Sequence, residues 1–221
     1  MISASFLSIK DNLKENIKVL DNTTIDMLHV DIMDGVFVPN KTWNIFTIKE
    51  LLSDTKSRKD VHLMVCDVLK YIDDFKTINP DYITFHYEAI DNIYDTIMYI
   101  KFLNIKVGLS IKPNTSVNDI LPYLPYLDLV LVMSVEPGLG GQIFIENSVN
   151  KINMLYDLRE KNNYHYLIEV DGGINDKTYK LCNKADILVV GSFITNGNYQ
   201  EQIDKIRIKK IIYDNIKRRN V

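Results

Sequence analysis

The strongest constraint on the fold is an alternation that repeats along the whole chain, in which a short apolar run is followed by an amphipathic stretch. Apolar runs of this length, rich in isoleucine, leucine and valine, are typical of buried β-strands. Eight such runs are expected to be strands: Ile2–Leu7, Ile25–Asp31, Val61–Val65, Tyr82–His86, Ile105–Ile111, Leu129–Met133, Tyr166–Val170 and Ile187–Val190. Strands that alternate with helices are parallel, because each crossover helix returns the chain to the same end of the sheet.

Three of the amphipathic stretches carry apolar residues three or four positions apart, which places those residues on one face of a helix. The apolar positions are Leu13, Ile17 and Leu20, then Val68, Ile72 and Phe75, then Ile93, Ile97 and Ile100. Asp11 and Asp91 precede the first and the third of these stretches, so they are expected to cap the helices.

Eight strand–helix units in 221 residues predict an α/β fold, a (β/α)8 TIM barrel with a parallel eight-stranded barrel. We expect one domain over residues 1–221, because a chain of this length closes one sizeable core and no linker-like segment divides it. An open doubly wound sheet is the alternative fold. It is disfavoured because no G-x-G-x-x-G motif follows the first strand, as a dinucleotide site there requires.

Charge and hydropathy narrow the range of partners and locations. A net charge of -3 gives no electrostatic reason to expect nucleic acid or an anionic membrane as partner. No apolar run approaches the ~20 residues of a membrane span, and no signal peptide precedes the first strand, so a cytoplasmic protein is expected. Cys66 and Cys182 form no Cys-x-x-Cys pair and are expected to be buried, reduced thiols. The basic stretch from Lys205 to Arg219 is expected to belong to a last helix.

Histidines and carboxylates gather at the carboxyl ends of predicted strands, the rim where barrel enzymes build their active sites. Because side chains alternate across a strand, His29 and Asp31 point to the same side. His62 has a similar position on the third strand, and Asp171 follows the seventh. Two imidazoles and two carboxylates suit one divalent ion, which could be Zn, Fe(II), Co or Mn.

Each of these residues also has an ordinary interpretation. A single His-x-Asp on a strand is more often a hydrogen-bonded pair than a metal site, because barrel rims are generally polar. An isolated His62 on an apolar strand is more often a core histidine, and interior methionines often fill gaps in a core. The common placement of the four side chains at one rim favours the metal site.

Three glycine-containing segments follow the last three strands: Pro137–Gln142, Asp171–Gly173 and Gly191–Ser192. Glycine lets backbone N–H groups approach an oxyanion closely, and an adjoining helix N-terminus adds positive potential. Any one segment is more often an ordinary turn. Three of them around one sector of a barrel that also has a ligand cluster favour a phosphate site.

Five segments together resemble the ribulose-phosphate 3-epimerase family over nearly the whole chain. They are Leu28–Asn40, Asp60–Val65, Val132–Gln142, Val170–Gly173 and Val190–Ser192, of which the first and third are long and specific. The resemblance implies epimerisation at C3 of D-ribulose 5-phosphate to D-xylulose 5-phosphate in the pentose phosphate pathway. Two aspartates would transfer the protons, through an enediolate that the metal stabilises.

The resemblance also implies roles for individual residues. His29, Asp31, His62 and Asp171 would bind one divalent metal ion, with Asp31 and Asp171 as the two catalytic acid/base groups. The sugar phosphate would be bound by Ser5, His62, Met33, Met64, Met133, Gly138, Leu139, Gly140, Gly141, Asp171, Gly172, Gly173, Gly191 and Ser192. Leu139 departs from the family pattern, which has an aromatic residue there. The loop Asp34–Asn40 is a candidate lid, and a homo-oligomer is expected.

Three other functions are compatible with such a barrel. An epimerase for a six-carbon ketose phosphate would differ in pocket depth, which the sequence does not reveal. A non-catalytic barrel that binds sugar phosphates would have lost at least one aspartate or ligand, and all are present. A related decarboxylase would be expected to have an Asp-x-Lys-x-x-Asp run on the third strand, whereas this chain has Asp60-Val61-His62 there.

Overall fold

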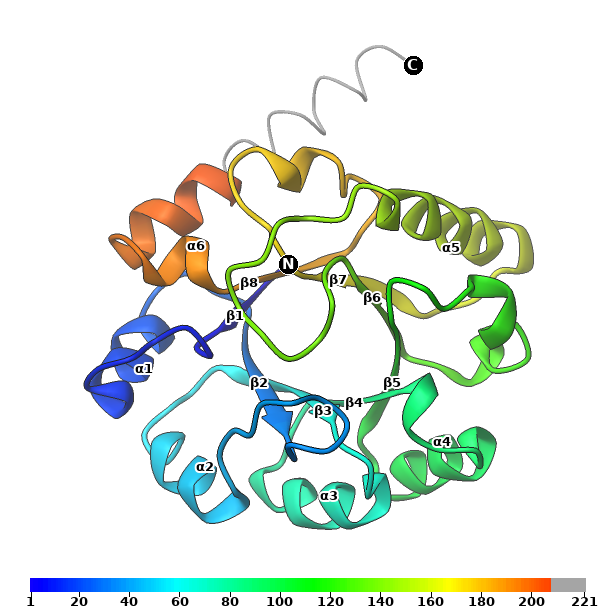
Figure 1. Ribbon diagram of the computed structural model, residues 1–221, viewed down its shortest axis with the longest axis horizontal. Helices are drawn as coiled ribbons and strands as arrows, with labels where there is room; N and C mark the ends of the chain where they lie inside the picture. The colour runs from blue at the N-terminus through cyan, green and yellow to red at the C-terminus, as the bar shows by residue number, and fades with distance from the viewer. Residues whose placement is uncertain (208–221) are drawn as a thin grey trace.

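The computed structural model describes residues 1–207, and its strands form one closed parallel barrel (Figure 1). The strands are β1 (Ile2–Ser5), β2 (Met27–Met33), β3 (Arg58–Met64), β4 (Tyr82–His86), β5 (Lys106–Ile111), β6 (Leu129–Met133), β7 (Leu167–Asp171) and β8 (Ile187–Val190). Each strand pairs in parallel with the next, and β8 pairs with β1. The predicted (β/α)8 barrel is therefore confirmed, and the open-sheet alternative is wrong because the first and last strands are hydrogen-bonded to each other.

Helices and short 3-10 turns form the ring outside the barrel (Figure 1). The helices are α1 (Leu13–Asp21), α2 (Ile45–Leu51), α3 (Val68–Phe75), α4 (Ile93–Phe102), α5 (Ser148–Asn162) and α6 (Ser192–Thr195). The 3-10 turns are η1 (Lys76–Ile78), η2 (Tyr87–Ala89), η3 (Val117–Ile120), η4 (Leu124–Tyr126) and η5 (Thr178–Lys180). The connections after β5 and β7 carry only 3-10 turns, and residues 199–207 are helical.

The three helices expected from apolar spacing are α1, α3 and α4, and their apolar faces are buried against the strands. The two expected caps are wrong. Asn12 and Asn92 occupy the N-cap positions, and neither side chain makes a capping hydrogen bond. Asn12 has a left-handed backbone, with φ of 45°, so α1 begins one residue later than a cap at Asp11 would allow.

The hydrophobic core has one part outside the barrel and another inside it. Outward-facing strand residues such as Leu28, Val30 and Ile32 pack against the helices. Inside the barrel, a smaller cluster consists of Met27, Tyr82, Leu129, Leu131, Met133, Val135 and Ile187. Fully burying one such side chain contributes about 1.5–3 kcal/mol, so this packing holds the strand ends rigidly in place.

Several further expectations concern the ends and surface of the chain. Among the helices of residues 1–207, none has the length and apolar character of a membrane span. Cys182 is buried as expected, but Cys66 is exposed, because it lies just past the end of β3 on the rim. The predicted single domain and the predicted basic last helix both extend into residues 208–221, which lie outside the described residues.

Candidate active site

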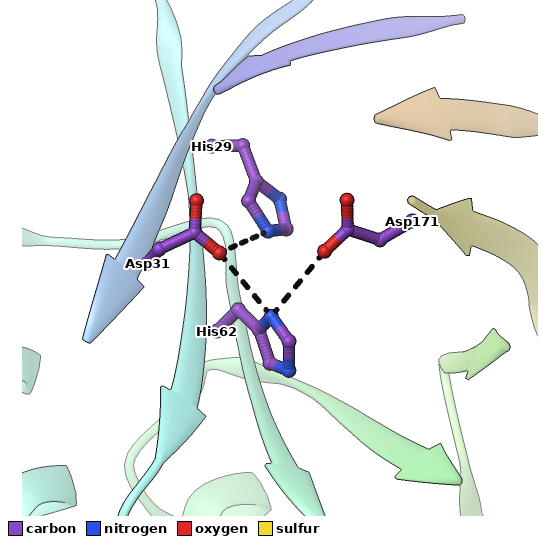
Figure 2. A group of neighbouring side chains, drawn as sticks. All are labelled: His29, Asp31, His62 and Asp171. Atoms are coloured by element: carbon purple, nitrogen blue, oxygen red, sulfur yellow. Dashed lines mark ion pairs between the residues drawn. The ribbon is translucent and has the colours of Figure 1, made fainter. Parts of the chain in front are cut away.

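The four predicted metal ligands converge at one end of the barrel (Figure 2). Strand register places Asp31 of β2 directly beside His62 of β3, and Asp171 is the last residue of β7 on the other side of the barrel. Oδ1 of Asp31 lies 3.4 Å from Nε2 of His29 and 3.5 Å from Nδ1 of His62. Nδ1 of His62 also lies 3.9 Å from Oδ2 of Asp171. One donor atom from each residue lies within 4.8 Å of the others.

The imidazole nitrogens of this cluster show that it fits a cation. Nε2 of His29 and Nδ1 of His62 are buried, and neither has a hydrogen-bond partner among the described residues. Both atoms face carboxylate oxygens, as Figure 2 shows. A buried polar atom without a partner is energetically costly, and a divalent ion would satisfy both nitrogens and both carboxylates at once. The residues present therefore fit a metal ion with two nitrogen and two oxygen ligands.

In the metal-free protein, a proton takes the place of the cation. Burial lowers the pKa of His29, but the charges of Asp60 and Asp31 outweigh this effect and raise that pKa well above 6.5. Burial raises the pKa of Asp31, but electrostatic attraction to the neighbouring His29 and His62 rings outweighs this effect and lowers that pKa below 3.8. The site thus holds an ionised Asp31 beside a protonated His29, and the proton must leave before His29 can bind a metal.

Asp171 behaves in the opposite way to Asp31. Burial, and then repulsion from the Asp31 carboxylate, raise the pKa of Asp171 from 3.8 to about 6. Two carboxyl groups in one site whose pKa values are displaced in opposite directions are a common arrangement of acid/base pairs. The environment therefore distinguishes the two aspartates chemically.

The outer nitrogen of each candidate ligand histidine is held by other side chains. Nδ1 of His29 lies 2.7 Å from Oδ2 of Asp60, which also accepts a hydrogen bond from Ser3 at 2.8 Å. Nε2 of His62 lies 2.9 Å from Nε2 of His86. Burial lowers the pKa of His86 to about 4, so this imidazole is neutral near pH 7.

Sequence reasoning did not identify Asp60, His86 or Glu169 as part of the site. Glu169 belongs to it because one of its carboxylate oxygens lies within 4.8 Å of ligand atoms of His29 and Asp60. Asp60 lies two positions before His62, and Glu169 lies two positions before Asp171, so strand alternation places both on the inward face. The alternation of side chains therefore sufficed to predict that Asp60 and Glu169 point into the barrel. Alternation from Thr84, which pairs with His62, also places His86 inward, but its contact with His62 depends on how two neighbouring strands bring their rings together.

A pocket opens above the ligand cluster and contains nearly all of the predicted substrate residues. Those that line it are Ser5, Met33, Met64, Met133, Gly138, Leu139, Gly140, Gly141, Asp171, Gly172, Gly173, Gly191 and Ser192, and the predicted catalytic Asp31 lines it too. His62 is not in the lining; it is fully buried. Residues that the sequence did not single out, including Ser8, Val135 and Ile174, complete the wall.

The glycine segments of the pocket wall have backbone conformations that require glycine. Gly172 and Gly173 have φ values of 121° and 64°, a region that other residues rarely adopt. A Cβ atom on Gly173 would lie only 2.5 Å from the backbone nitrogen of Phe144. The helix that follows Gly191 is the four-residue α6, so the backbone of the glycine segments is the main feature that favours a phosphate here.

Two loops meet at the mouth of the pocket. The side chain of Asn40, in the loop after β2, donates a hydrogen bond of 2.8 Å to the carbonyl oxygen of Gly138, in the loop after β6. Val38 packs against Gly138, and a Cβ atom there would lie 3.0 Å from Cβ of Val38. In Figure 1 the loop between β6 and α5 extends over the centre of the barrel. The loop after β6 therefore covers the pocket, and the loop after β2 contacts it through Asn40 and Val38.

Comparison with known proteins agrees with this geometry. The profile of the ribulose-phosphate 3 epimerase family matches residues 1–195. The ribulose-phosphate 3-epimerase of Treponema pallidum (strain Nichols) is 39% identical over 180 residues, which are 80% of this chain and 83% of that protein. That of Synechocystis sp. (strain ATCC 27184 / PCC 6803 / Kazusa) is 37% identical over 215 residues, or 95% and 92% of the two chains.

Among solved structures, KGPDC from Streptococcus mutans aligns with a TM-score of 0.65 and covers 95% of this chain and 96% of that chain. Its sequence is only 13% identical, so this likeness shows the barrel fold alone. The family profile and the relatives carry the assignment. The chain therefore belongs to the ribulose-phosphate 3 epimerase family and is an isomerase acting on carbohydrates.

Proposed function

We propose that this chain interconverts D-ribulose 5-phosphate and D-xylulose 5-phosphate by epimerisation at C3, as a step of the pentose phosphate pathway. The observation that carries the proposal is the pair Asp31 and Asp171, which face each other across the pocket floor (Figure 2) and whose pKa values are displaced in opposite directions. The activity named for the relatives from Treponema and Synechocystis supports it.

The reaction explains why two carboxylates are needed. Inverting a carbon beside a carbonyl group requires a base that removes the proton from one face and an acid that returns a proton to the other. A single group would restore the starting sugar. Asp31 and Asp171 would flank C3, and the direction of reaction decides which of them is the base. The Ser5 hydroxyl donates to Oδ2 of Asp31 at 2.7 Å and holds that carboxylate in place.

Acid/base transfer alone contributes about 10²- to 10⁴-fold to a rate, so the negative charge formed when C3 loses its proton must also be stabilised. A divalent ion, Zn, Fe(II), Co or Mn, held by His29, Asp31, His62 and Asp171 would supply this stabilisation as a Lewis acid. Its four ligands are fixed on β2, β3 and β7, so they need little rearrangement when it binds.

The rest of the pocket would orient the sugar and exclude water. Met33, Met64 and Met133 line it with flexible apolar side chains that fit closely around the reacting carbons. The phosphate would lie against the backbone of Gly172, Gly173, Gly191 and Ser192 and of the segment Gly138–Gly141. Leu139 is 64% exposed at this edge of the pocket.

The proposal is tested by assaying metal-stripped and metal-restored protein on D-ribulose 5-phosphate in deuterated water, following D-xylulose 5-phosphate and deuterium at C3. Restored protein is expected to turn over and to exchange at C3, and stripped protein is not. Asp31→Asn and Asp171→Asn should each abolish epimerisation, with any surviving exchange confined to one epimer. Asp157→Asn is the control, because its side chain is 70% exposed on α5.

Absence of turnover and of exchange in the restored wild type would refute the pentulose assignment. The same assay on a six-carbon ketose phosphate then separates an epimerase for that substrate from a barrel that only binds sugar phosphates. A homo-oligomer, a cytoplasmic location and the absence of a nucleic-acid partner remain predictions.

A further inference from the structure

The hydrogen bonds of His62 continue away from the pocket towards the protein surface. Nε2 of His62 lies 2.9 Å from Nε2 of His86, and Nδ1 of His86 lies 3.2 Å from Oε2 of Glu88. Both imidazoles are fully buried, whereas the Glu88 side chain is 21% exposed. The three side chains come from β3, β4 and η2, so the series joins the floor of the site to the outer rim of the barrel.

When both imidazoles are neutral, one arrangement of hydrogens satisfies this series. A carboxylate can only accept, so Nδ1 of His86 carries a hydrogen and donates it to Glu88. Nε2 of a neutral His86 is then bare and accepts the hydrogen on Nε2 of His62. A neutral His62 has one ring hydrogen, so its Nδ1 is left bare. That atom faces Asp31 and Asp171 at 3.5 Å and 3.9 Å.

We propose that Glu88 and His86 are positioning residues which hold His62 in the tautomer whose Nδ1 can bind a divalent ion. The inference rests on the metal site of the proposed function and adds to it. In the opposite tautomer, Nδ1 of His62 would carry a hydrogen and could not be a ligand. Glu88 therefore acts on the site without touching the metal, the substrate or a ligand.

Two further hydrogen bonds fix the orientation of the Glu88 carboxylate. Its Oε1 atom accepts from the backbone N–H of Lys112 at 2.8 Å and from the hydroxyl of Thr115. Oε1 therefore accepts from Lys112 and Thr115, and Oε2 accepts from His86. The Phe37 ring packs against His86 with 4.8 Å between ring centroids, which holds the imidazole in the series.

This geometry makes Glu88→Gln an informative substitution, because the side chain keeps its shape but has only one oxygen. The N–H of Lys112 requires an acceptor, so the amide oxygen would stay there and the NH₂ group would face Nδ1 of His86. His86 would then accept on Nδ1 and carry its hydrogen on Nε2. It would donate to His62, whose hydrogen would move to Nδ1, the atom that the metal needs.

The first experiment reads the tautomers directly by ¹⁵N NMR of the full chain labelled at histidine. The four histidines are His29, His62, His86 and His165, and the variants His165→Asn and His29→Asn assign the signals of the two outside the series. In wild type, His86 is expected to be protonated on Nδ1 and His62 on Nε2. In Glu88→Gln, both are expected to change to the other nitrogen. Glu50→Gln is the matched control, because Glu50 is exposed on α2.

The second experiment measures Co²⁺ affinity by the visible absorption of the bound ion. Glu88→Gln is expected to weaken binding about 10- to 100-fold, the usual effect of removing a group that orients a ligand. Glu50→Gln should bind as wild type does. In a His86→Leu background, Glu88→Gln should have no further effect, because Glu88 is proposed to act only through His86. Circular dichroism and thermal unfolding check that each variant folds.

Unchanged tautomers and unchanged Co²⁺ affinity in Glu88→Gln would overturn the inference. Equal weakening by Glu88→Gln with and without His86 would also overturn it. If wild type does not bind Co²⁺, the metal site fails and this inference fails with it. If Co²⁺ binds and the tautomers behave as expected, but D-ribulose 5-phosphate is not epimerised, the inference stands and only the proposed reaction fails. The tautomer experiment remains decisive even if His86→Leu does not fold.

Discussion

Nδ1 of His29 lies 2.7 Å from Oδ2 of Asp60, and both side chains are fully buried in the barrel. This contact turns Nε2 of His29 towards Asp31. His62 has a different partner, because its outer nitrogen lies against the neutral imidazole of His86. His29 therefore contacts a carboxylate directly, whereas His62 reaches the Glu88 carboxylate only through the His86 ring.

Asp60→Asn is expected to weaken Co²⁺ binding by about 10- to 100-fold, because the amide removes the charge that makes His29 a good donor. The measurement is a titration of metal-stripped protein with Co²⁺, followed by absorption. Asp157→Asn serves as the control, since Asp157 pairs with Lys184 at 2.9 Å on the surface. Equal affinities for Asp60→Asn and wild type would show that Asp60 does not support His29.

The stability of the metal-free protein should depend on Asp171 between about pH 4 and pH 6. The pKa of Asp171 is raised from 3.8 to about 6 in the folded protein, so the folded state holds a proton that the unfolded chain has released in this range. A folded state that binds more protons loses stability as pH rises. The free energy of unfolding should therefore fall from about pH 4 to pH 6.

The measurement is urea unfolding in the presence of a chelator at several pH values. Asp171→Asn removes the titrating group, so its stability should fall less steeply than that of wild type over the same range. Metal binding requires the ionised carboxylate, and the affinity for Co²⁺ should accordingly rise with pH through about 6. Parallel stability curves for the two proteins would contradict the assignment of this proton to Asp171.

Gly173→Ala should destabilise the protein more than Gly141→Ala does. Both glycines have left-handed backbones, with φ of 64° and 75°, so alanine is strained by roughly 1–2 kcal/mol at either position. At Gly173 the new Cβ would also lie 2.5 Å from the Phe144 nitrogen, whereas at Gly141 the nearest atom is Ser192 Oγ at 3.9 Å. Thermal unfolding measures the difference, at about 2–4 °C per kcal/mol. Equal melting temperatures would mean that the chain moves aside at Phe144.

Asn40→Ala should raise the KM for the sugar phosphate, whereas its melting temperature should fall no further than that of Asn162→Ala. The side chain joins the two loops above the pocket, and one such hydrogen bond contributes about 0.5–1.5 kcal/mol, or roughly 2- to 10-fold in binding. Asn162→Ala is the matched control, because Asn162 also donates to a backbone carbonyl at 2.8 Å, but on the outside of the barrel. An unchanged KM in Asn40→Ala would argue against a lid at residues 34–40.

The strands could be predicted from the sequence because each is a short apolar run with clear limits. The bounds of β4, β6 and β8 are as expected. β3 begins three residues before its apolar run, because Arg58, Lys59 and Asp60 still pair with β2, and β2 is shifted two residues towards the carboxyl end of the expected strand. The sequence could not show whether Asp11 and Asp91, or the residues after them, occupy the N-cap positions. Asparagine follows each of them directly, and the choice of the first helical residue depends on backbone angles.

Within the site, alternation along a strand predicts which residues point inward, and the register between β2 and β3 then brings Asp31 beside His62. The approach of Asp171 requires that the barrel close, which apolar patterning indicates only indirectly. The hydrogen bonds that join His62, His86 and Glu88 could not be predicted, because they depend on side-chain conformations and on a 3-10 turn after β4.

The pairing of β1 with β8 has a consequence for synthesis on the ribosome. The amino group of Met1 donates to the carbonyl oxygen of Asp186, a residue 185 positions later. Contacts of such long range slow folding, because the entropy of closing the loop is lost before the contact forms. Ser5 and Ser192, which line the same pocket, therefore meet only after most of the nascent chain has emerged. A shortened translation product that lacks β8 should bind neither the ion nor the sugar phosphate.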